Sequence, residues 1–165
     1  MTLKTIEGDL IKLAEQGEFD VIVHGANCFH TMGSGIAGQL ATKYPEVLEA
    51  DKETIYGERV KLGSWSHATI NTQNHKFNVV NAYTQHFFGL GKDVFEYEAF
   101  EVFLNTFSQF LPMYSKEFDK PISIGFPMIG AGLAGGDWNR ISKMIEKFSE
   151  DVSQFADVTV VIYKP

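Results

Sequence analysis

Residues 19–35 read FDVIVHGANCFHTMGSG, and this stretch decides the fold. The continuous apolar run Val21-Ile22-Val23 predicts a strand that is buried on both faces and lies in the middle of a sheet. A loop with three glycines, residues 25–35, follows the strand, and helical spacing begins at Ile36. This order indicates an α/β fold whose ligand site lies at the carboxyl end of the strand.

The alternation of strands and helices continues on both sides of this stretch. Apolar runs predict further strands at 3–7, 64–70, 77–83, 122–126 and 158–163; the first is an edge strand, and 64–70 pairs with 77–83 as a hairpin. Helical spacing is found from Leu10, over 36–48 with a break at Pro45, over 95–114 and over 138–148, with Asp9 and Asp137 as N-caps. We therefore predict one domain, 1–165, with a three-layer α/β/α fold and a mixed central sheet.

Composition limits the classes of ligand. The chain has 165 residues, with 14 Lys and Arg against 21 Asp and Glu, so its formal net charge is -7. Without a run of basic residues, nucleic-acid binding is not expected, and a phosphate ligand must be held by backbone N–H groups. The lone Cys28, and the lack of a signal-like or membrane-spanning apolar stretch, lead us to expect a cytoplasmic protein that does not bind membranes. We expect a monomer.

Two glycine-rich loops carry the candidate chemistry. Residues 33–38 satisfy G-x-G-x-x-G, a pattern of dinucleotide-binding loops. A Rossmann site is disfavoured, because its glycines follow the strand directly, whereas residues 26–32 intervene here. The second loop, PMIGAGLAGG at 127–136, also follows a strand and precedes a helix. Two such loops at one sheet edge predict that backbone N–H groups hold a diphosphate from both sides.

In combination, four segments resemble the macrodomain family. They are Gly8-Asp9-Leu10, Val21-Ile22-Val23 running into Asn27, Gly33-Ser34-Gly35-Ile36-Ala37 and Gly130-Ala131-Gly132-Leu133. The resemblance covers nearly the whole chain and implies the macrodomain fold, with ADP-ribose or a derivative of it as the partner. The Asn-Cys pair and the second loop are similar to those of the branch of ADP-ribose-1″-phosphate phosphatases and related ADP-ribosyl and acyl-ADP-ribose hydrolases.

The resemblance also implies a ligand-binding set. Asp9 would accept a hydrogen bond from the adenine amino group, Tyr163 would lie against the adenine, and Asn27 would touch the distal ribose. The two loops would surround the diphosphate. The complete set is Asp9, Leu10, Asn27, Gly33, Ser34, Gly35, Ile36, Pro127, Ile129, Gly130, Ala131, Gly132, Leu133 and Tyr163.

Asn27, His30 and Asp137 are the candidate catalytic residues. Histidine titrates near neutral pH, so His30 suits proton transfer to or from water or a leaving group, although it also fits a solvent-facing loop. Asp137 matches an acid used in catalysis by that branch and equally fits an N-cap, and the two roles are compatible. The reaction expected is hydrolysis of ADP-ribose-1″-phosphate to ADP-ribose and phosphate. The alternatives are de-ADP-ribosylation of acidic side chains, deacetylation of O-acetyl-ADP-ribose, and a non-catalytic reader of ADP-ribose.

Neither a metal nor a cofactor is expected. His67, His75 and His86 lack metal-ligand spacing, His24 fits a satisfied core residue and Cys28 a small packing residue. Some hydrolases of the branch use a lysine on the strand after the hairpin turn, but residues 79–83 contain none. Residues 87–91 fit either a flap over the ligand or a plain surface loop.

Overall fold

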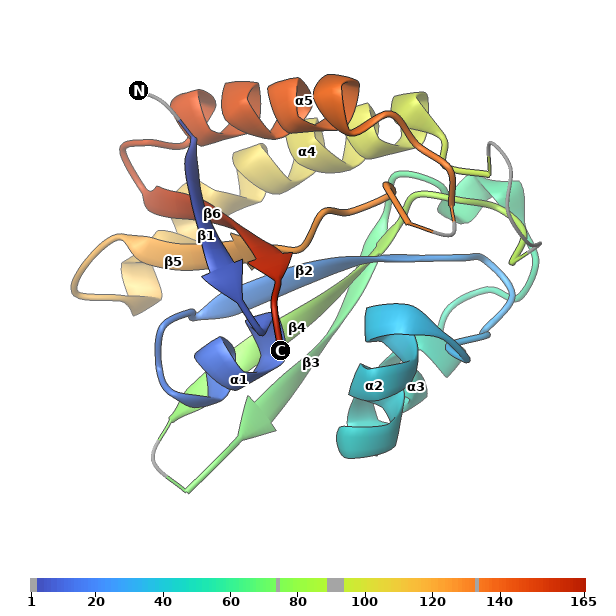
Figure 1. The fold of residues 1–165 in the computed structure, drawn as a ribbon, viewed down its shortest axis with the longest axis horizontal. Helices are drawn as coiled ribbons and strands as arrows, with labels where there is room; N and C mark the ends of the chain where they lie inside the picture. The colour runs from blue at the N-terminus through green and yellow to red at the C-terminus, as the bar shows by residue number, and fades with distance from the viewer. Residues whose placement is uncertain (1–2, 74, 89–93, 133) are drawn as a thin grey trace.

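The computed structural model describes residues 3–73, 75–88, 94–132 and 134–165, which form a sheet between two layers of helices (Figure 1). The strands are β1 Lys4–Gly8, β2 Val21–Ala26, β3 Trp65–Asn71, β4 Lys76–Tyr83, β5 Ile122–Phe126 and β6 Ala156–Tyr163. Their order is β1-β6-β5-β2-β4-β3. Neighbouring strands are parallel except β3, which pairs antiparallel with β4. The prediction of a mixed sheet is confirmed.

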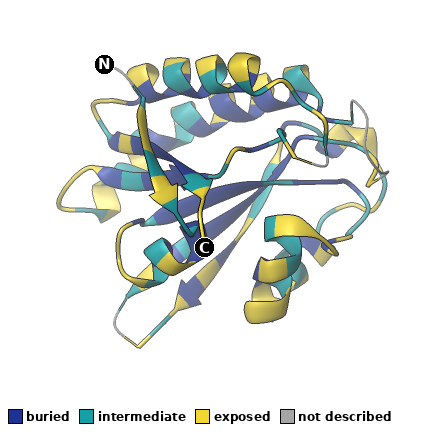
Figure 2. Cartoon of the chain, in the orientation of Figure 1, coloured by how far each residue is buried: buried dark blue, intermediate teal, exposed yellow. Residues whose placement is uncertain are grey.

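The central position of β2 follows from its sequence. Val21 and Val23 are buried on one face and Ile22 on the other, so the strand must be covered by helices on both sides. β2 lies between β5 and β4, as the apolar run predicts, and β1 forms one edge of the sheet, also as predicted. Figure 2 shows the buried residues concentrated in the middle strands.

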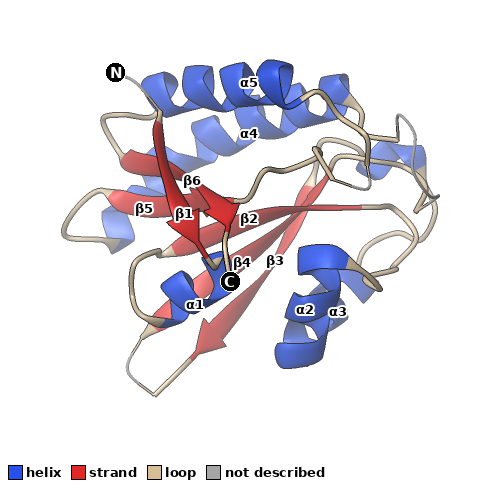
Figure 3. Ribbon diagram, in the orientation of Figure 1, coloured by secondary structure: helices blue, strands red, loops and turns tan. Residues whose placement is uncertain are grey.

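Helices cover both faces of the sheet (Figure 3). α1 Leu10–Glu15, α2 Gly35–Lys43 and α3 Pro45–Lys52 pack on one face, and α4 Tyr97–Tyr114 and α5 Trp138–Asp151 pack on the other. Two short 3₁₀ helices, η1 Arg59–Lys61 and η2 Ser115–Glu117, complete the set. Within the described part of the chain, no helix combines the length and apolar character needed to cross a bilayer.

Two helix boundaries differ from those expected: the end of α3 and the start of α4. The break at Pro45 is present, but the helix that begins there continues to Lys52, beyond the expected end at residue 48. Pro45 occupies the first turn of this helix, where its missing N–H costs no hydrogen bond. Phe95 does not begin α4; it is buried and forms an isolated β-bridge with Gln85. The bridge to Gln85 and the hydrogen bond from the Phe95 N–H to the Ala134 carbonyl hold Phe95 outside the helix.

The parallel strands fix the place of the site. β1, β6, β5, β2 and β4 run in the same direction, so their carboxyl ends lie along one edge of the sheet. The two glycine-rich loops leave from β2 and β5, which are neighbours. The loops therefore face each other across one strand spacing, about 5 Å.

Candidate functional site

A cavity of about 350 Å³ lies at the carboxyl ends of β2, β4 and β5. Both glycine-rich loops line it, as do the ends of β2 and the segment after β4. Its described lining consists of Gly25, Ala26, Asn27, Thr31, Gly33, Ser34, Gly35, Ile36, Ala37, Thr84, Gln85, Phe88, Pro127, Met128, Ile129, Gly130, Gly132 and Ala134. None of these described side chains is ionisable, so within this lining the charge of a ligand would be met by backbone N–H groups and by neutral side-chain donors.

The first loop is held in shape by Asn27. Its Oδ1 accepts a hydrogen bond from the Phe29 N–H at 2.8 Å, and its Nδ2 donates to the Thr31 carbonyl at 2.8 Å. Asn27 is 8% exposed and lines the cavity. Because an amide group carries two N–H donors, one donor of Asn27 is left for a ligand.

Unpaired backbone donors of α2 face the cavity. The N–H groups of Gly35, Ile36 and Ala37 have no acceptor among the described residues, as is usual for the first turn of a helix. The side chain of the N-cap residue Ser34 makes no capping hydrogen bond. The N-terminus of α2, with its partial positive charge, therefore points at the cavity with its donors unused.

The second loop adds donors from the opposite side. Its Ile129, Ala131 and Gly136 N–H groups bond to carbonyls of the same loop. The N–H groups of Gly130 and Gly132 have no acceptor in the part of the chain that the structure describes. Since both residues line the cavity, donors from two loops converge on one space, which is the arrangement that binds a diphosphate.

The glycines of the two loops are not all required by the fold. Gly130 has φ 76°, and a Cβ placed on it would lie 2.4 Å from Phe95, so the fold itself requires glycine there. Gly33 and Gly132 have no positive φ, and a Cβ on either would meet nothing within 4 Å. Packing does not require glycine at these two positions, but a ligand that approaches the backbone closely would.

The adenine-binding candidates lie along the same sheet edge, outside the cavity lining. Gly8 pairs with Tyr163 at the ends of β1 and β6. Asp9 caps α1, with Oδ1 accepting from the Lys12 N–H at 3.1 Å, which leaves Oδ2 without a described partner. Tyr163 is 63% exposed, whereas the Leu10 side chain is buried in the core.

The structure does not bring the side chains of His30 and Asp137 into the cavity. His30 has φ 54°, and its Nε2 lies 3.0 Å from the Thr54 carbonyl. Asp137 is exposed and caps α5, with Oδ1 accepting from the Asn139 N–H at 3.0 Å, while its own N–H donates to the Tyr97 hydroxyl. Of the three catalytic candidates, only Asn27 lines the cavity.

Most of the predicted ligand-binding residues of the two glycine-rich loops line the cavity, but not all of them do. Gly33, Ser34, Gly35, Ile36, Pro127, Ile129, Gly130 and Gly132 line the cavity, whereas Ala131 does not. Leu133 and residues 89–91 of the expected flap lie outside the described residues. Phe88, from the expected flap, lines the cavity, and so do Thr84 and Gln85, which were not predicted. Thr84 and Gln85 directly follow an apolar strand, and a parallel pairing of that strand with β2 would have placed them at this edge.

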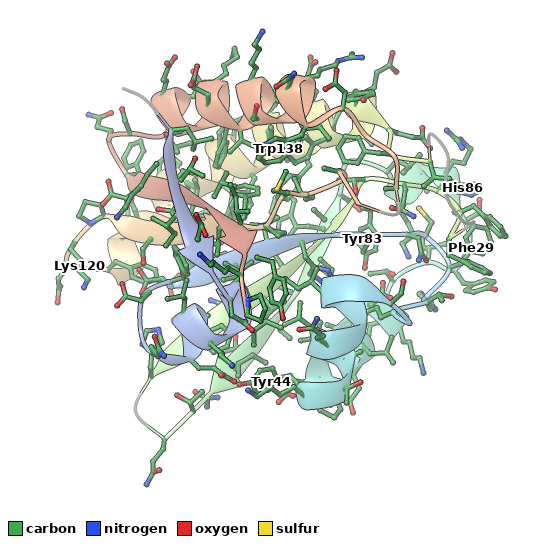
Figure 4. All side chains as sticks on the ribbon, in the orientation of Figure 1. Phe29, Tyr44, Tyr83, His86, Lys120 and Trp138 are labelled. Carbon is green, nitrogen blue, oxygen red and sulfur yellow. The ribbon has the colours of Figure 1, made fainter. Side chains whose placement is uncertain are left out.

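A buried polar network supports the first loop from behind. The Tyr83 hydroxyl donates to Asp51 Oδ1 at 2.7 Å and lies 2.8 Å from Ser66 Oγ. Lys61 Nζ lies 4.4 Å from the centre of the Tyr83 ring and 3.4 Å from the Cys28 carbonyl. Burial lowers the pKa of Lys61, and the charge of Asp51 opposes this shift. Figure 4 shows Tyr83 in the interior of the molecule.

Cys28 and His24 are both buried, as expected, but only one nitrogen of His24 is satisfied. Burial raises the pKa of the Cys28 thiol, whose Sγ contacts the Gln85 carbonyl. His24 Nε2 lies 2.5 Å from Asn81 Oδ1, and Asn81 uses its N–H donors elsewhere, so His24 carries its proton on Nε2. Nδ1 is buried and has no partner among the described residues.

This geometry predicts a pH dependence of stability. Burial lowers the pKa of His24, and the hydrogen bond to Asn81 opposes the shift only in part. The unfolded state then binds the proton more readily, so the free energy of unfolding falls as the pH drops below about 6.5, by up to about 1.4 kcal/mol per pH unit. Urea unfolding at pH 7.5 and 5.5 measures this loss. His24→Gln should lose less stability between these pH values than the wild type, and an equal loss would contradict the assignment.

No group of three His, Cys, Asp or Glu side chains in the described ranges is arranged to hold a metal ion. The cavity lining offers no thiolate, imidazole or carboxylate ligand either.

Comparison with known proteins identifies similar chains. A family model described as Macro domain matches residues 23–145. A 17.5 kDa protein of the tk-vs intergenic region of Enterobacteria phage T4 is 38% identical over 166 residues, which cover 100% of this chain and 99% of that protein. A structure from Bacteroides thetaiotaomicron, described as a protein of unknown function, is 28% identical over 98% of each chain, with a TM-score of 0.70. Thermosipho africanus DarTG in complex with ADP-ribose superposes with a TM-score of 0.75 at 18% identity, over 98% of this chain and 42% of that one.

Proposed function

Because this chain belongs to the macro domain family, we propose that it binds ADP-ribose in the cavity between its two glycine-rich loops. The observation that carries the proposal is the convergence of unpaired N–H groups from Gly35, Ile36, Gly130 and Gly132 on one space. A diphosphate carries its charge on oxygens that accept such hydrogen bonds, so an acidic protein can hold it without a lysine. The ADP-ribose complex of Thermosipho africanus DarTG, which has the same fold, supports the choice of ligand.

The adenosine arm would run from the cavity toward β1. Asp9 and Tyr163 lie at the ends of β1 and β6, whereas the cavity begins at β5. Two strand spacings, roughly 10 Å, separate β1 from β5, so the ligand must be elongated to reach both regions. The free Oδ2 of Asp9 suits the amino group of adenine, and the exposed ring of Tyr163 suits its face.

The terminal ribose would occupy the other end of the cavity. Asn27, Thr84 and Gln85 line this end and supply neutral donors and acceptors for ribose hydroxyls. Binding energy from the distant diphosphate and adenosine would hold the C1″ atom of the ribose in one position for attack by water.

We further propose that the protein hydrolyses a bond at C1″, with ADP-ribose-1″-phosphate as the preferred substrate. The described cavity lining holds no ionisable side chain to protonate a leaving group. The monoanionic form of the phosphate ester releases HPO₄²⁻ and an ester of a carboxylic acid releases a carboxylate; each of these stable anions takes the electron pair of the C1″–O bond, whereas an alkoxide needs a proton. Water adds to C1″ and releases one proton to solvent. Proton transfer by His30 or Asp137 is not part of this proposal, because both side chains are engaged outside the lining.

Phosphorus NMR and calorimetry test both parts of the proposal. Calorimetry should detect binding of ADP-ribose, and NMR should detect phosphate released from ADP-ribose-1″-phosphate by the wild type, by His30→Ala and by Asp137→Ala. O-acetyl-ADP-ribose and ADP-ribosyl-glutamate have carboxylate leaving groups and are the next substrates to test, whereas ADP-ribosyl-serine should stay intact. If ADP-ribose binds but no substrate is cleaved, the protein is a reader. Loss of turnover in His30→Ala or Asp137→Ala would show that these groups manage the proton.

A further inference from the structure

A second cavity, of about 420 Å³, lies at the amino ends of β1, β5 and β6, three strands that lie side by side (Figure 1). The first residues of these strands, the segment between α1 and β2, and Ser149 of α5 line this amino-end cavity. The cavity proposed for ADP-ribose lies at the carboxyl ends of the strands, and no described residue lines both. The amino-end cavity is therefore a separate candidate site.

The short helix α1 leaves this part of the sheet uncovered. α1 has six residues and packs over Gly125, where a Cβ would lie 2.8 Å from the Leu10 side chain. Ser123 pairs with Asp157, and Gly125 pairs with Thr159. Because paired and alternate residues of a sheet share a face, Ser123, Asp157 and Thr159 lie on the face of α1. This face is thus apolar under the helix and polar at the amino ends of the strands.

Two buried hydroxyl groups line the amino-end cavity. Thr159 is 6% exposed and Ser149 8%, and neither hydroxyl has a hydrogen-bond partner among the described residues. In the described part of the chain, His24 Nδ1 alone is both enclosed and without a partner, so the two hydroxyls keep access to the cavity. Buried polar groups are normally paired, and a ligand in the cavity would supply the missing partners.

Charges of both signs are available around the same cavity. Lys4, Glu18 and Asp157 line it and are exposed. The ion pairs formed by the described residues involve other side chains. Lys4 pairs with Thr159 across β1 and β6, so its side chain starts beside the buried hydroxyl. One ammonium group and two carboxylates are therefore free to meet a ligand.

The mixed charges indicate the class of ligand. An inorganic anion would meet two carboxylates for one ammonium group. A metal ion lacks ligands, because no three His, Cys, Asp or Glu side chains in the described ranges are grouped to hold one. A zwitterion could place its ammonium group at Glu18 or Asp157 and its carboxylate at Lys4. The apolar side chains of Ile6 and Phe19 in the lining suit an apolar group between them.

We propose that the amino-end cavity binds a zwitterion of the α-amino acid class with an apolar side chain. The hydroxyls of Thr159 and Ser149 can accept from the ammonium group or donate to the carboxylate of such a ligand. Binding here does not depend on ADP-ribose, since the two cavities share no described residue.

The test follows binding of L-leucine by amide NMR of the isotopically labelled protein. The signals that should shift, and saturate, are those of Lys4, Ile6, Glu18, Phe19, Ser123, Asp157 and Thr159. Isoamylamine keeps the ammonium group and the apolar chain without the carboxylate, and isocaproate keeps the carboxylate without the ammonium group. Each analogue should bind at least about tenfold more weakly than L-leucine, because a hydrogen bond to a charged group is lost.

Two variants locate the ligand. Thr159→Val removes the hydroxyl at nearly the same shape, and Lys4→Met removes the ammonium group. Each should weaken L-leucine binding about tenfold. Thr5→Val and Lys116→Met change exposed residues outside the lining and should bind L-leucine as the wild type does. Thermal unfolding checks the fold of all four variants, and Thr159→Val should not lower the midpoint, because its hydroxyl has no protein partner to lose.

Each outcome decides a separate question. Without saturable shifts from L-leucine at these residues, the proposal is wrong. Equal binding of isoamylamine or isocaproate would overturn the choice of a zwitterion. Wild-type affinity in both Thr159→Val and Lys4→Met would place the ligand elsewhere; if Thr159→Val unfolds, the exposed Lys4 decides alone. Titration of the same variants with ADP-ribose tests the other cavity, so failure of the proposed function would leave this inference standing.

Discussion

Gly33→Glu should weaken ADP-ribose binding at least about a hundredfold, equivalent to about 2.7 kcal/mol. A Cβ at Gly33 meets nothing within 4 Å and the residue has no positive φ, so the fold should accept the substitution. The new side chain would start at the cavity wall, beside the N-terminus of α2, and place a carboxylate where the diphosphate is proposed to bind. Its charge would repel the diphosphate and compete for the same N–H groups. Calorimetric titration with ADP-ribose measures the loss.

Two control variants separate the possible causes. Gly33→Gln has the same size without the charge, and it should lose less affinity than Gly33→Glu. Thermal unfolding should give similar midpoints for the wild type and both variants, because the added atoms meet open space. Unchanged affinity in Gly33→Glu would show that the ligand does not approach this loop. A large drop in its unfolding midpoint would show that the loop, rather than the ligand, requires glycine.

Asp51→Ala should lower the free energy of unfolding by about 1–3 kcal/mol, the usual cost when a buried hydrogen-bonding group loses its partner. Asp51 is 1% exposed and accepts the hydrogen bond of the Tyr83 hydroxyl. Its carboxylate is also the charge that favours the buried ammonium of Lys61. Without it, the hydroxyl loses an acceptor and the ammonium has no nearby opposite charge to offset its desolvation. Urea unfolding at neutral pH measures the change.

A double-mutant cycle tests whether Asp51 and Lys61 act together. Asp51→Ala combined with Lys61→Met should lose less stability than the sum of the two single variants, because the double variant leaves no unpaired buried charge. The surface pair of Lys147 and Asp151, with side chains 73% and 48% exposed, provides the control. Asp151→Ala should cost less than about 1 kcal/mol. Strict additivity at Asp51 and Lys61 would mean that the network does not couple them.

Much of the fold could be predicted from local patterns. The run Val21 to Val23 identified the central strand, and the caps Asp9 and Asp137 marked the starts of α1 and α5. The hairpin of β3 and β4 was also predicted. These features depend on residues close together in the sequence, where apolar period and capping chemistry act directly. The parallel pairing of β4 with β2 was not predicted, because it joins strands that the intervening helices separate in the chain.

The direction of loop side chains was harder to predict. His30 and Asn27 belong to the same loop, yet only Asn27 lines the cavity. The left-handed backbone at His30 and its contact with Thr54 turn the imidazole toward the segment after α3. The spacing of residues in the sequence does not show that the φ angle of His30 is positive. Nor does it show that the imidazole of His30 contacts Thr54, which lies 24 residues away in the chain. Loop residues could therefore be assigned to the site region but not to individual roles.

The sequence by itself determined the order of strands and helices, the buried central strand and the two glycine-rich loops at strand ends, because period, capping and turn chemistry are local. Only the tertiary structure decided which N–H groups stay unpaired, which side chains reach the cavity, and how Phe29, Tyr56 and Phe87 come together in one surface. These properties arise when distant segments pack together. Whether an N–H group is unpaired, or an aromatic ring is exposed, depends on the atoms that other segments place next to it.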